Sequence, residues 1–388
     1  MEASQRRAKL EAPLSREKWV RSRSLFLVGV FLVAALCARP MIGEAAPTAN
    51  FQADPRLGEV PLVVHFNNTS NGEGPLTFHW DFGDGQQNTA RDPAPHTYLA
   101  PGPFEVTLTV TDNMGQYDRH SVVINVDGPT LLAALLPVSR SVVVGNTATA
   151  FATIINAGHV TAPGVKIQLD NATGPGGTPL PAAFTFQTTD PATNLVIGSP
   201  NEPVDIPAGE SRSFLIAVTP SVAFAPIDVR FDIDGSNSTR DARTVIGLNT
   251  LLLSSSTQAT PDIVALAATP DSNGILTLAG SPRAGAFSVA TVNVGTSGSI
   301  TASADAGGSG LPISLSVCRT TPTTGQCETA PAPSVETFIS TGATSTFAVF
   351  ASAGGPVLFD PEVNRIFLRF RDASGVVRGA TSVAVKGP

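Results

Sequence analysis

The stretch that most constrains the fold of this chain is His79–Gly85, with the sequence HWDFGDG. Trp80 and Phe82 lie two positions apart, so a β-strand places both rings on the same face. Gly83 and Gly85 interrupt the acidic segment that follows, as turn residues do. The pattern therefore predicts a strand that runs into a turn, within a sheet that packs around an aromatic core.

Two further segments extend this pattern, namely residues 92–98 (DPAPHTY) and 102–112 (GPFEVTLTVTD). Together with WDFGDG they resemble the PKD domain, over about Thr48 to Val126. The resemblance implies a β-sandwich of immunoglobulin-like architecture. Such domains serve as stalks, spacers or adhesion modules in cell-surface proteins and as accessory domains in secreted hydrolases, without catalysis of their own. The structural motif that the resemblance assigns comprises Trp80, Asp81, Phe82, Gly83, Asp84, Gly85, His96 and Tyr98.

Apolar and polar residues alternate along Phe104–Thr111, where Val106, Leu108 and Val110 are separated by threonines. This alternation is typical of an antiparallel strand with one buried and one solvated face. The abundance of Gly (35) and Pro (32) is typical of a chain with many short strands that are separated by turns. No window after Thr130 has helical periodicity. We therefore predict an all-β chain of tandem immunoglobulin-like β-sandwiches.

A weak internal repeat links two segments behind the PKD-like region. Asn156 and its neighbours recur 137 positions later around Asn293, and 231–235 matches 368–372 at the same offset. A third patch, 240–245, matches 378–383 at an offset of 138. A repeat of this length indicates duplication of a whole domain, because solenoid repeats are much shorter. Chance similarity in a sequence rich in Ala, Val, Thr and Ser is the alternative.

A chain of 388 residues exceeds what one hydrophobic core usually organises. We predict a signal segment (1–46), a PKD-like β-sandwich (47–128), a β-sandwich module (129–253) and a related module (261–388). Ser254–Thr260 is rich in hydroxyl residues and reads as a linker. On this interpretation the modules behave as independent units joined by flexible connections.

The N-terminus has the order of an export signal. Residues 1–24 are rich in Arg and Lys and precede an apolar run from Leu25 to Ala38, which Arg39-Pro40 ends. The run is shorter than the roughly 20 residues of a spanning helix, so removal near Ala45 is favoured over retention as an anchor. We expect an exported protein that is secreted, periplasmic or at the cell surface, with membrane contact only through this segment.

The charge pattern argues against binding to nucleic acid. Only 14% of residues are charged, the formal net charge is −7, and no basic stripe is present. An acidic surface of this kind mainly keeps a protein soluble and repels anionic polymers.

No motif for catalysis, a metal or a cofactor stands out. The five histidines lack the spacing of a metal site, and a Gly-x-Ser-x-Gly nucleophile motif is absent. Asp81 and Asp84 could offer oxygen ligands to calcium, but aspartates in turns usually bind their own backbone. Cys318 and Cys327 flank a loop with Pro and Gly and predict a disulfide, with a two-cysteine metal site as the alternative.

These features predict a non-catalytic protein that acts in adhesion, protein–protein contact or spacing, with an unidentified surface protein or polysaccharide as its partner. The alternative is an accessory polysaccharide- or protein-binding protein that works beside secreted hydrolases. A third hypothesis, an unrecognised hydrolase, is supported only by scattered aspartates.

Overall fold

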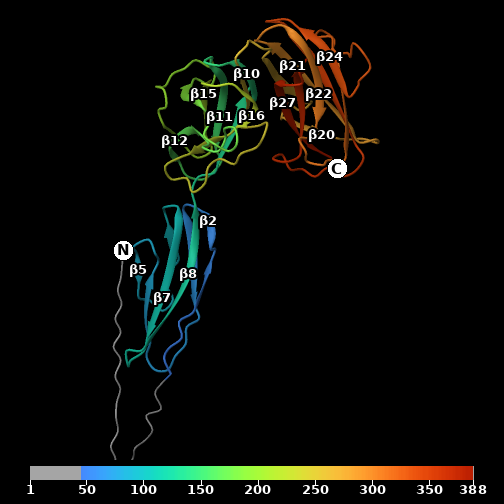
Figure 1. The fold of residues 1–388 in the computed structure, drawn as a ribbon. Coiled ribbons are helices and arrows are strands. Elements are labelled where there is room, and N and C mark those ends of the chain that lie inside the picture. The colour runs from blue at the N-terminus through green and yellow to red at the C-terminus, as the bar shows by residue number, and fades with distance from the viewer. Residues whose placement is uncertain (1–44, 388) are drawn as a thin grey trace, which may run out of the picture. The chain divides into compact units, whose positions relative to one another are not determined.

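The alternating segments of the sequence form β-strands throughout the computed structural model, which describes residues 45–387 (Figure 1). All elements of this range are strands, so the predicted all-β class of tandem immunoglobulin-like sandwiches is confirmed. No segment of residues 45–387 forms a helix with the length and hydropathy of a membrane span. The expected export segment, with Cys37, lies almost entirely outside the described residues.

The first module contains eight strands in two sheets, ordered β1-β3-β6 and β2-β8-β7-β4-β5. Its strands are β1 Phe51–Asp54, β2 Leu57–Glu59, β3 Leu62–Asn68, β4 Thr77–Asp81, β5 Gln87–Asn88, β6 His96–Tyr98, β7 Gly102–Thr111 and β8 Tyr117–Asp127. Trp80 is fully buried at the centre of the core. Its ring lies 5.0 Å from that of Phe51 and 5.7 Å from that of Phe66, and its indole N–H donates to the Ala90 carbonyl.

The second module has a separate core and ten strands. Its strands are β9 Leu131–Leu136, β10 Ser139–Val143, β11 Ala148–Asn156, β12 Ala162–Leu169, β13 Ala182–Thr189, β14 Val204–Ile206, β15 Ser211–Pro220, β16 Phe224–Val229, β17 Phe231–Asp234 and β18 Leu251–Ser256. The strand β13 begins the four-stranded sheet β13-β15-β11-β9. The opposite layer consists of β10-β18-β16 and β14-β12-β17.

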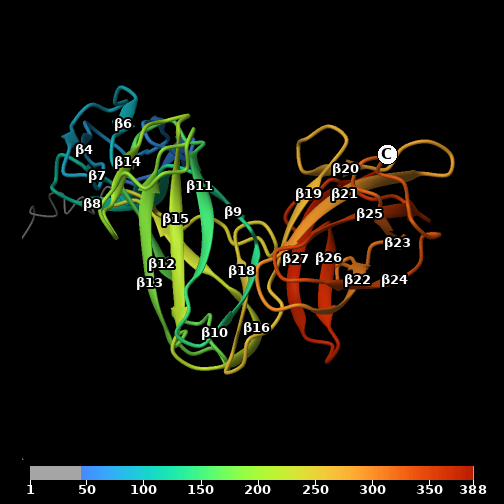
Figure 2. The same cartoon turned by 90° about the horizontal axis from the view of Figure 1, so that it is seen from above.

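The third module also has its own core. Its strands are β19 Ile263–Ala268, β20 Ile275–Thr277, β21 Ala284–Asn293, β22 Gly298–Asp305, β23 Ile313–Thr320, β24 Ser334–Ile339, β25 Thr344–Ala353, β26 Arg365–Asp372 and β27 Val377–Lys386. They form the sheets β19-β21-β25-β23 and β20-β27-β26-β22-β24 (Figure 2). Three separate cores agree with the three predicted sandwiches, while the exact domain boundaries stay a prediction.

The second and third modules share one topology, as expected for a duplicated domain. The order β13-β15-β11-β9 matches β23-β25-β21-β19, and β10 runs parallel to β18 as β20 does to β27. The repeated asparagines also have the same role. Asn156 is fully buried, and its amide donates to the carbonyls of Val160 and Ile206. Asn293 is equally buried and donates to Thr296 and Ile339.

The predicted correspondence of the third pair of repeated segments is wrong. Residues 240–245 lie outside any strand, whereas 378–383 lie in β27. The strand that corresponds to β27 in topology is β18, which begins later, at Leu251. The mismatch arises because β17 and β18 are joined by a long loop, while β26 and β27 are joined by a tight turn. Apparent similarity in small residues led to the wrong register.

The prediction of a flexible linker at Ser254–Thr260 is also wrong for its first half, because Ser254–Ser256 belong to β18. Just after it, the Asp262 carboxylate is buried and accepts hydrogen bonds from Ser141 N (2.9 Å) and Arg140 Nε (3.0 Å) of β10. The Ser139 hydroxyl donates to the carbonyl of Ala380 in β27 and accepts from its N–H. Buried polar contacts of this kind join the second module to the third.

Gly247 makes this docking sterically possible. It lies in the loop before β18 with a φ of 77°, and a Cβ there would be 2.5 Å from a ring carbon of Phe367. Its carbonyl accepts a hydrogen bond from the Ser382 hydroxyl, at 2.7 Å. Only glycine combines this backbone conformation with such a close approach.

We expect Trp80→Ala to lower the free energy of unfolding of the first module by about 3–5 kcal/mol, because it empties the centre of an aromatic core. Trp80→Phe, which keeps a buried ring, should cost less. Differential scanning calorimetry of the purified chain measures both. An unchanged transition in Trp80→Ala would contradict the core assignment.

We expect Gly247→Ala to destabilise the chain by about 1–3 kcal/mol more than Gly145→Ala does. Both positions have a positive φ, so both substitutions carry the same backbone strain, but a Cβ at Gly145 meets nothing within 4 Å. Calorimetry of the two variants isolates the contact with Phe367. Equal losses would show that the ring moves aside without cost.

Candidate functional site

The acidic turn of the first module is organised by its own carboxylates. Asp81 accepts a hydrogen bond from Gly83 N, and Asp84 accepts one from Gln86 N and binds the His96 Nε2 atom at 2.8 Å. A Cβ on Gly83 would lie 2.7 Å from the Glu105 carbonyl oxygen, so the turn requires glycine. Within residues 45–387, no group of three or more His, Cys, Asp or Glu side chains is arranged to hold a metal ion.

The structure brings the aromatic members of the predicted motif together. The imidazole of His96 stacks on Phe82 with ring centres 4.1 Å apart, and the Tyr98 hydroxyl donates to the Phe82 carbonyl at 3.0 Å. Trp80, Phe82 and Tyr98 are buried, and His96 is nearly so. Burial, together with the nearby Asp84 carboxylate, raises the pKa of Tyr98. These contacts join the turn to the core, so the motif fits a structural role.

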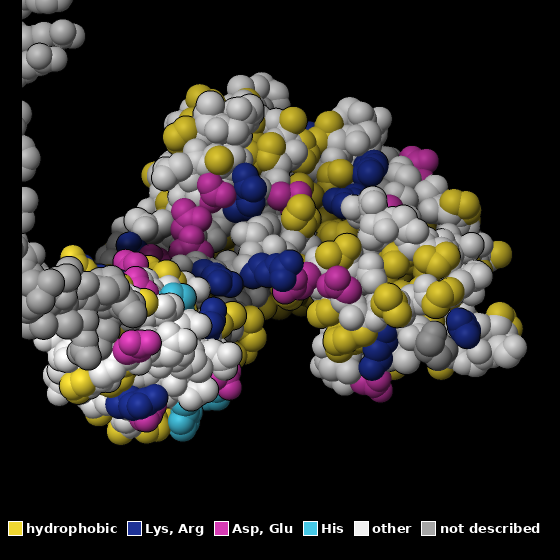
Figure 3. All heavy atoms as spheres, turned by 90° about the horizontal axis from the view of Figure 1, so that it is seen from below, with side chains coloured by type: hydrophobic (Ala, Val, Ile, Leu, Met, Phe, Trp, Pro, Cys, Tyr) yellow, Lys and Arg dark blue, Asp and Glu magenta, His cyan; other side chains and the backbone are white. Residues whose placement is uncertain are grey.

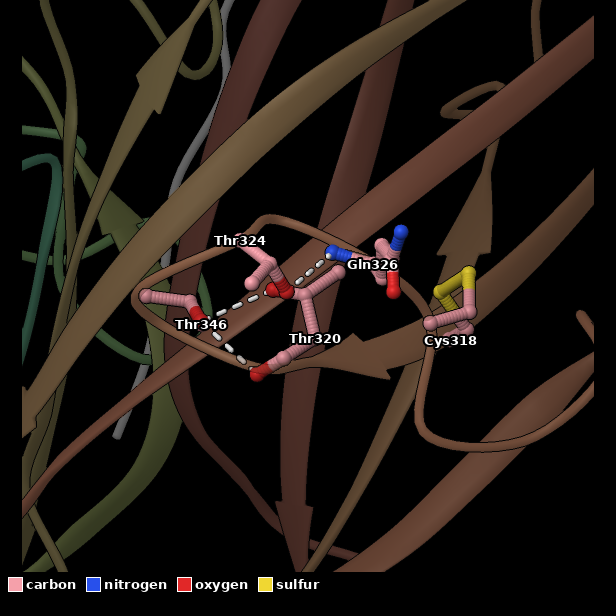
Figure 4. The surroundings of a disulfide bond; sticks show 6 residues. Cys318, Thr320, Thr324, Gln326 and Thr346 are labelled. Atoms are coloured by element: carbon pink, nitrogen blue, oxygen red, sulfur yellow. Dashed lines mark hydrogen bonds between the residues drawn. A yellow bond between two sulfur atoms is a disulfide. The ribbon is translucent and has the colours of Figure 1, made fainter.

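The cysteine pair forms a disulfide, which confirms the predicted bond (Figure 4). Cys318 is buried in β23, and Cys327 returns beside it across a short loop. Within the loop and its neighbouring strand, the hydroxyls of Thr320 and Thr346 bond to each other, and Gln326 N donates to the Thr324 hydroxyl. The alternative of a two-cysteine metal site does not hold, since both sulfur atoms are used in the bond.

An exposed apolar face lies on the second module. Leu132, Leu136, Phe151 and Ile155 are 51%, 51%, 38% and 43% exposed. They come from the outer side of the neighbouring strands β9 and β11, where Ile155 is opposite Leu132 and Phe151 opposite Leu136. We call these four residues the β9/β11 face. This face was not predicted from the sequence, although β9 reads LLAALL and so places apolar residues on both of its sides.

Charged residues on the face drawn in Figure 3, unlike the apolar residues of the β9/β11 face, do not form a patch of one kind. Lys and Arg side chains lie there next to Asp and Glu side chains. The ion pair of Arg243 with Glu362, at 2.6 Å, is an example of this mixing. Mixed charge favours solubility and offers little attraction for a polyanion.

A hollow of about 470 Å³ lies at the junction of the second and third modules, where it overlaps part of the β9/β11 face. Ala134, Leu136 and Phe151 line it from β9 and β11, while Ala267 and Arg365 line it from the third module. Arg365 is only 5% exposed. This volume is within the range of sites that bind small molecules, which often lie between domains.

The Arg365 guanidinium is held by neutral groups. Its Nε and Nη2 atoms donate to the Ser382 hydroxyl at 3.0 and 2.9 Å, and Nη1 donates to the Pro361 carbonyl at 2.9 Å. Burial lowers the pKa of Arg365 to about 10. Sequence reasoning could not find this residue, because a single arginine at the start of a strand carries no pattern.

We expect the first module to lose stability as the pH rises above about 10, where an unperturbed tyrosine ionises. The pKa of Tyr98 is raised in the folded state, so the unfolded state releases this proton first and gains free energy from doing so. Measured by thermal unfolding between pH 8 and 11, the stability of Tyr98→Phe should not show the decrease that comes from ionisation of Tyr98. Tyr117→Phe, at an exposed tyrosine, should retain it.

We expect the double variant Cys318→Ala, Cys327→Ala to lose about 2–3 kcal/mol of stability, because the unfolded chain regains the freedom of the closed loop. The loss should appear in the third module, and in the second as well if the junction couples them, but not in the first. Calorimetry with and without reductant measures it. A free thiol in the unreduced, unfolded protein would contradict the bond.

Residues 44–126 match the family described as PKD domain. Pre-pro-metalloprotease PrtV of Vibrio cholerae serotype O1 is 39% identical over 88 residues, which are 22% of this chain and 9% of PrtV. The chain therefore spans less than a tenth of that curated relative.

Two solved PKD1 domains are also similar in sequence to part of this chain. The PKD1 domain of PrtV is 39% identical, covering 21% of this chain and 99% of that domain, with a TM-score of 0.19. The PKD1 domain of Vibrio anguillarum Epp is 34% identical, covering 22% and 99%, with a TM-score of 0.20. The predicted resemblance is confirmed, and the chain contains a PKD domain, formed by residues 44–126.

Proposed function

We propose that this chain is an exported, non-catalytic binding protein that acts in adhesion or protein–protein contact, with the PKD domain as a spacer. The observation that carries the proposal is the β9/β11 face. Soluble monomeric proteins rarely expose contiguous apolar surface without a purpose, and such patches usually mark contact sites for other proteins. The disulfide supports an oxidising location outside the cytoplasm.

The chemistry of the face favours a protein partner over a polysaccharide. Three of its four side chains are aliphatic, and aliphatic groups pack well against the apolar side chains of another protein. A polysaccharide would instead need hydrogen-bonding groups and flat rings on which sugars stack, and the tryptophan of the PKD domain is buried.

A second candidate is an accessory role beside a hydrolase. The similarity of residues 44–126 to the PKD1 domain of a metalloprotease favours it. In that case the chain would bind the polymer on which the enzyme acts.

The test compares binding of the purified chain to envelope proteins of the producing cell and to a glycan array. We expect Leu132→Glu with Ile155→Glu to reduce protein binding by about tenfold or more, since two charges would have to be desolvated at the contact. The matched control is Ser288→Glu, an exposed position on β21, the strand of the third module that corresponds to β11. Glycan binding unaffected by the double variant would favour the accessory role and contradict the adhesion proposal.

A further inference from the structure

The junction hollow contains an unusual charged group. The structure buries two arginines among residues 45–387, Arg378 and Arg365. Arg378 contacts the Asp372 carboxylate at 2.6 Å. Arg365 has no carboxylate within 4.0 Å among the described residues, and all its hydrogen bonds go to uncharged oxygen atoms. A cation that is removed from water without a counter-ion is costly, so its retention calls for a compensating anion.

The guanidinium also retains hydrogen-bonding capacity. Each terminal nitrogen of an arginine carries two hydrogens, and Nη1 of Arg365 donates only to Pro361. The Ser382 hydroxyl is fully used, because it accepts from Arg365 and donates to the Gly247 carbonyl. The second hydrogen of Nη1 has no acceptor among the described residues, and Arg365 is one of the residues that line the hollow.

The rest of the lining defines the other part of the ligand. Ala134, Leu136, Phe151 and Ala267 are apolar, whereas the neutral polar residues at the same hollow are Thr153, Asn194, Thr381 and Ser382. A single positive charge matches a single negative charge, and an apolar wall matches a hydrocarbon body. Arg365 is the one charged residue in this lining, so a doubly charged phosphate or sulfate would lack a second cation.

We propose that the junction hollow binds a monocarboxylate with an apolar body, with the carboxylate on Arg365 and the hydrocarbon part against β9 and β11. Two sources share this chemistry, namely the free C-terminus of a peptide that ends in an apolar residue and a short-chain fatty acid. The proposal goes beyond the adhesion role, because it concerns a small-ligand site. This site shares Leu136 and Phe151 with the β9/β11 face but does not include Leu132 or Ile155.

The equivalent position of the second module supports a ligand-directed role. Residue 228 lies 137 positions before Arg365, and β16 and β26 occupy the same place in the two sheets. Asp228 there accepts a hydrogen bond from the Thr250 hydroxyl, and burial raises its pKa. The duplicated scaffold therefore does not require an arginine at this place, so the cation is particular to the third module.

The experiment measures binding to the full chain by isothermal titration calorimetry. The probes are N-acetyl-Leu-Phe as the free acid, the same dipeptide as its amide, hexanoate, and inorganic phosphate. We expect the free acid or hexanoate to bind at least about tenfold more tightly than the amide, because only they carry the charge. Tighter binding of the dipeptide acid would identify a peptide C-terminus as the ligand, and tighter binding of hexanoate would identify a short-chain fatty acid. Equal binding of acid and amide, binding of phosphate alone, or no binding of any probe would overturn the proposal.

Two variants test the position of the site. Arg365→Gln should weaken binding of the acid by about tenfold or more while leaving the weak binding of the amide unchanged. Ala134→Trp provides a second test if Arg365→Gln fails to fold. Ala134 is exposed on β9 and lines the hollow, so an indole there should fill the hollow without entering the core. Ser288→Trp is its control. Unchanged binding of the acid in Ala134→Trp would place the site elsewhere and overturn the proposal.

Discussion

The arrangement of the second and third modules depends on the hydrogen bonds that the buried carboxylate of Asp262 accepts from the second module. Asp262 lies at the start of β19 and accepts hydrogen bonds from the backbone of Ser141 and the side chain of Arg140. Its surroundings raise its pKa by burial, while Arg140 acts in the opposite direction. Removal of either donor would leave a buried charge without full compensation, so loss of this contact is expected to be costly.

Duplication explains both the similarity of the two modules and their difference. The amides of Asn156 and Asn293 satisfy backbone carbonyls that the sheets leave unpaired, and this requirement is the same in both copies. The surfaces are free to diverge, because outward side chains do not enter either core. Phe151 therefore stands on β11 where the third module has Ser288, and Asp228 stands where it has Arg365. Binding properties thus reside on faces that the duplicated scaffold does not constrain.

The PKD domain illustrates how a strong motif can be informative about structure and silent about a ligand. Trp80, His96 and Tyr98 are engaged by the turn and the core, and the acidic side chains of the turn bind its own backbone and His96. A motif whose polar groups satisfy one another offers few free partners to a substrate. The functional hypotheses therefore come from the other two modules, which lack a recognisable motif.

The sequence by itself determined the all-β class, the PKD segment, the disulfide and the duplication, because alternation, turn residues and spacing are local and survive in a single chain. It could not determine the register of the last repeated strand, since loop length between β17 and β18 is set by packing and leaves no periodic signal. It also missed the β9/β11 face and Arg365. Whether an apolar strand residue is buried or exposed, and whether an arginine meets a carboxylate, depends on which distant strands come to lie beside it. Only the tertiary structure decided how the second and third modules meet, because the contacts between them join residues more than 100 positions apart.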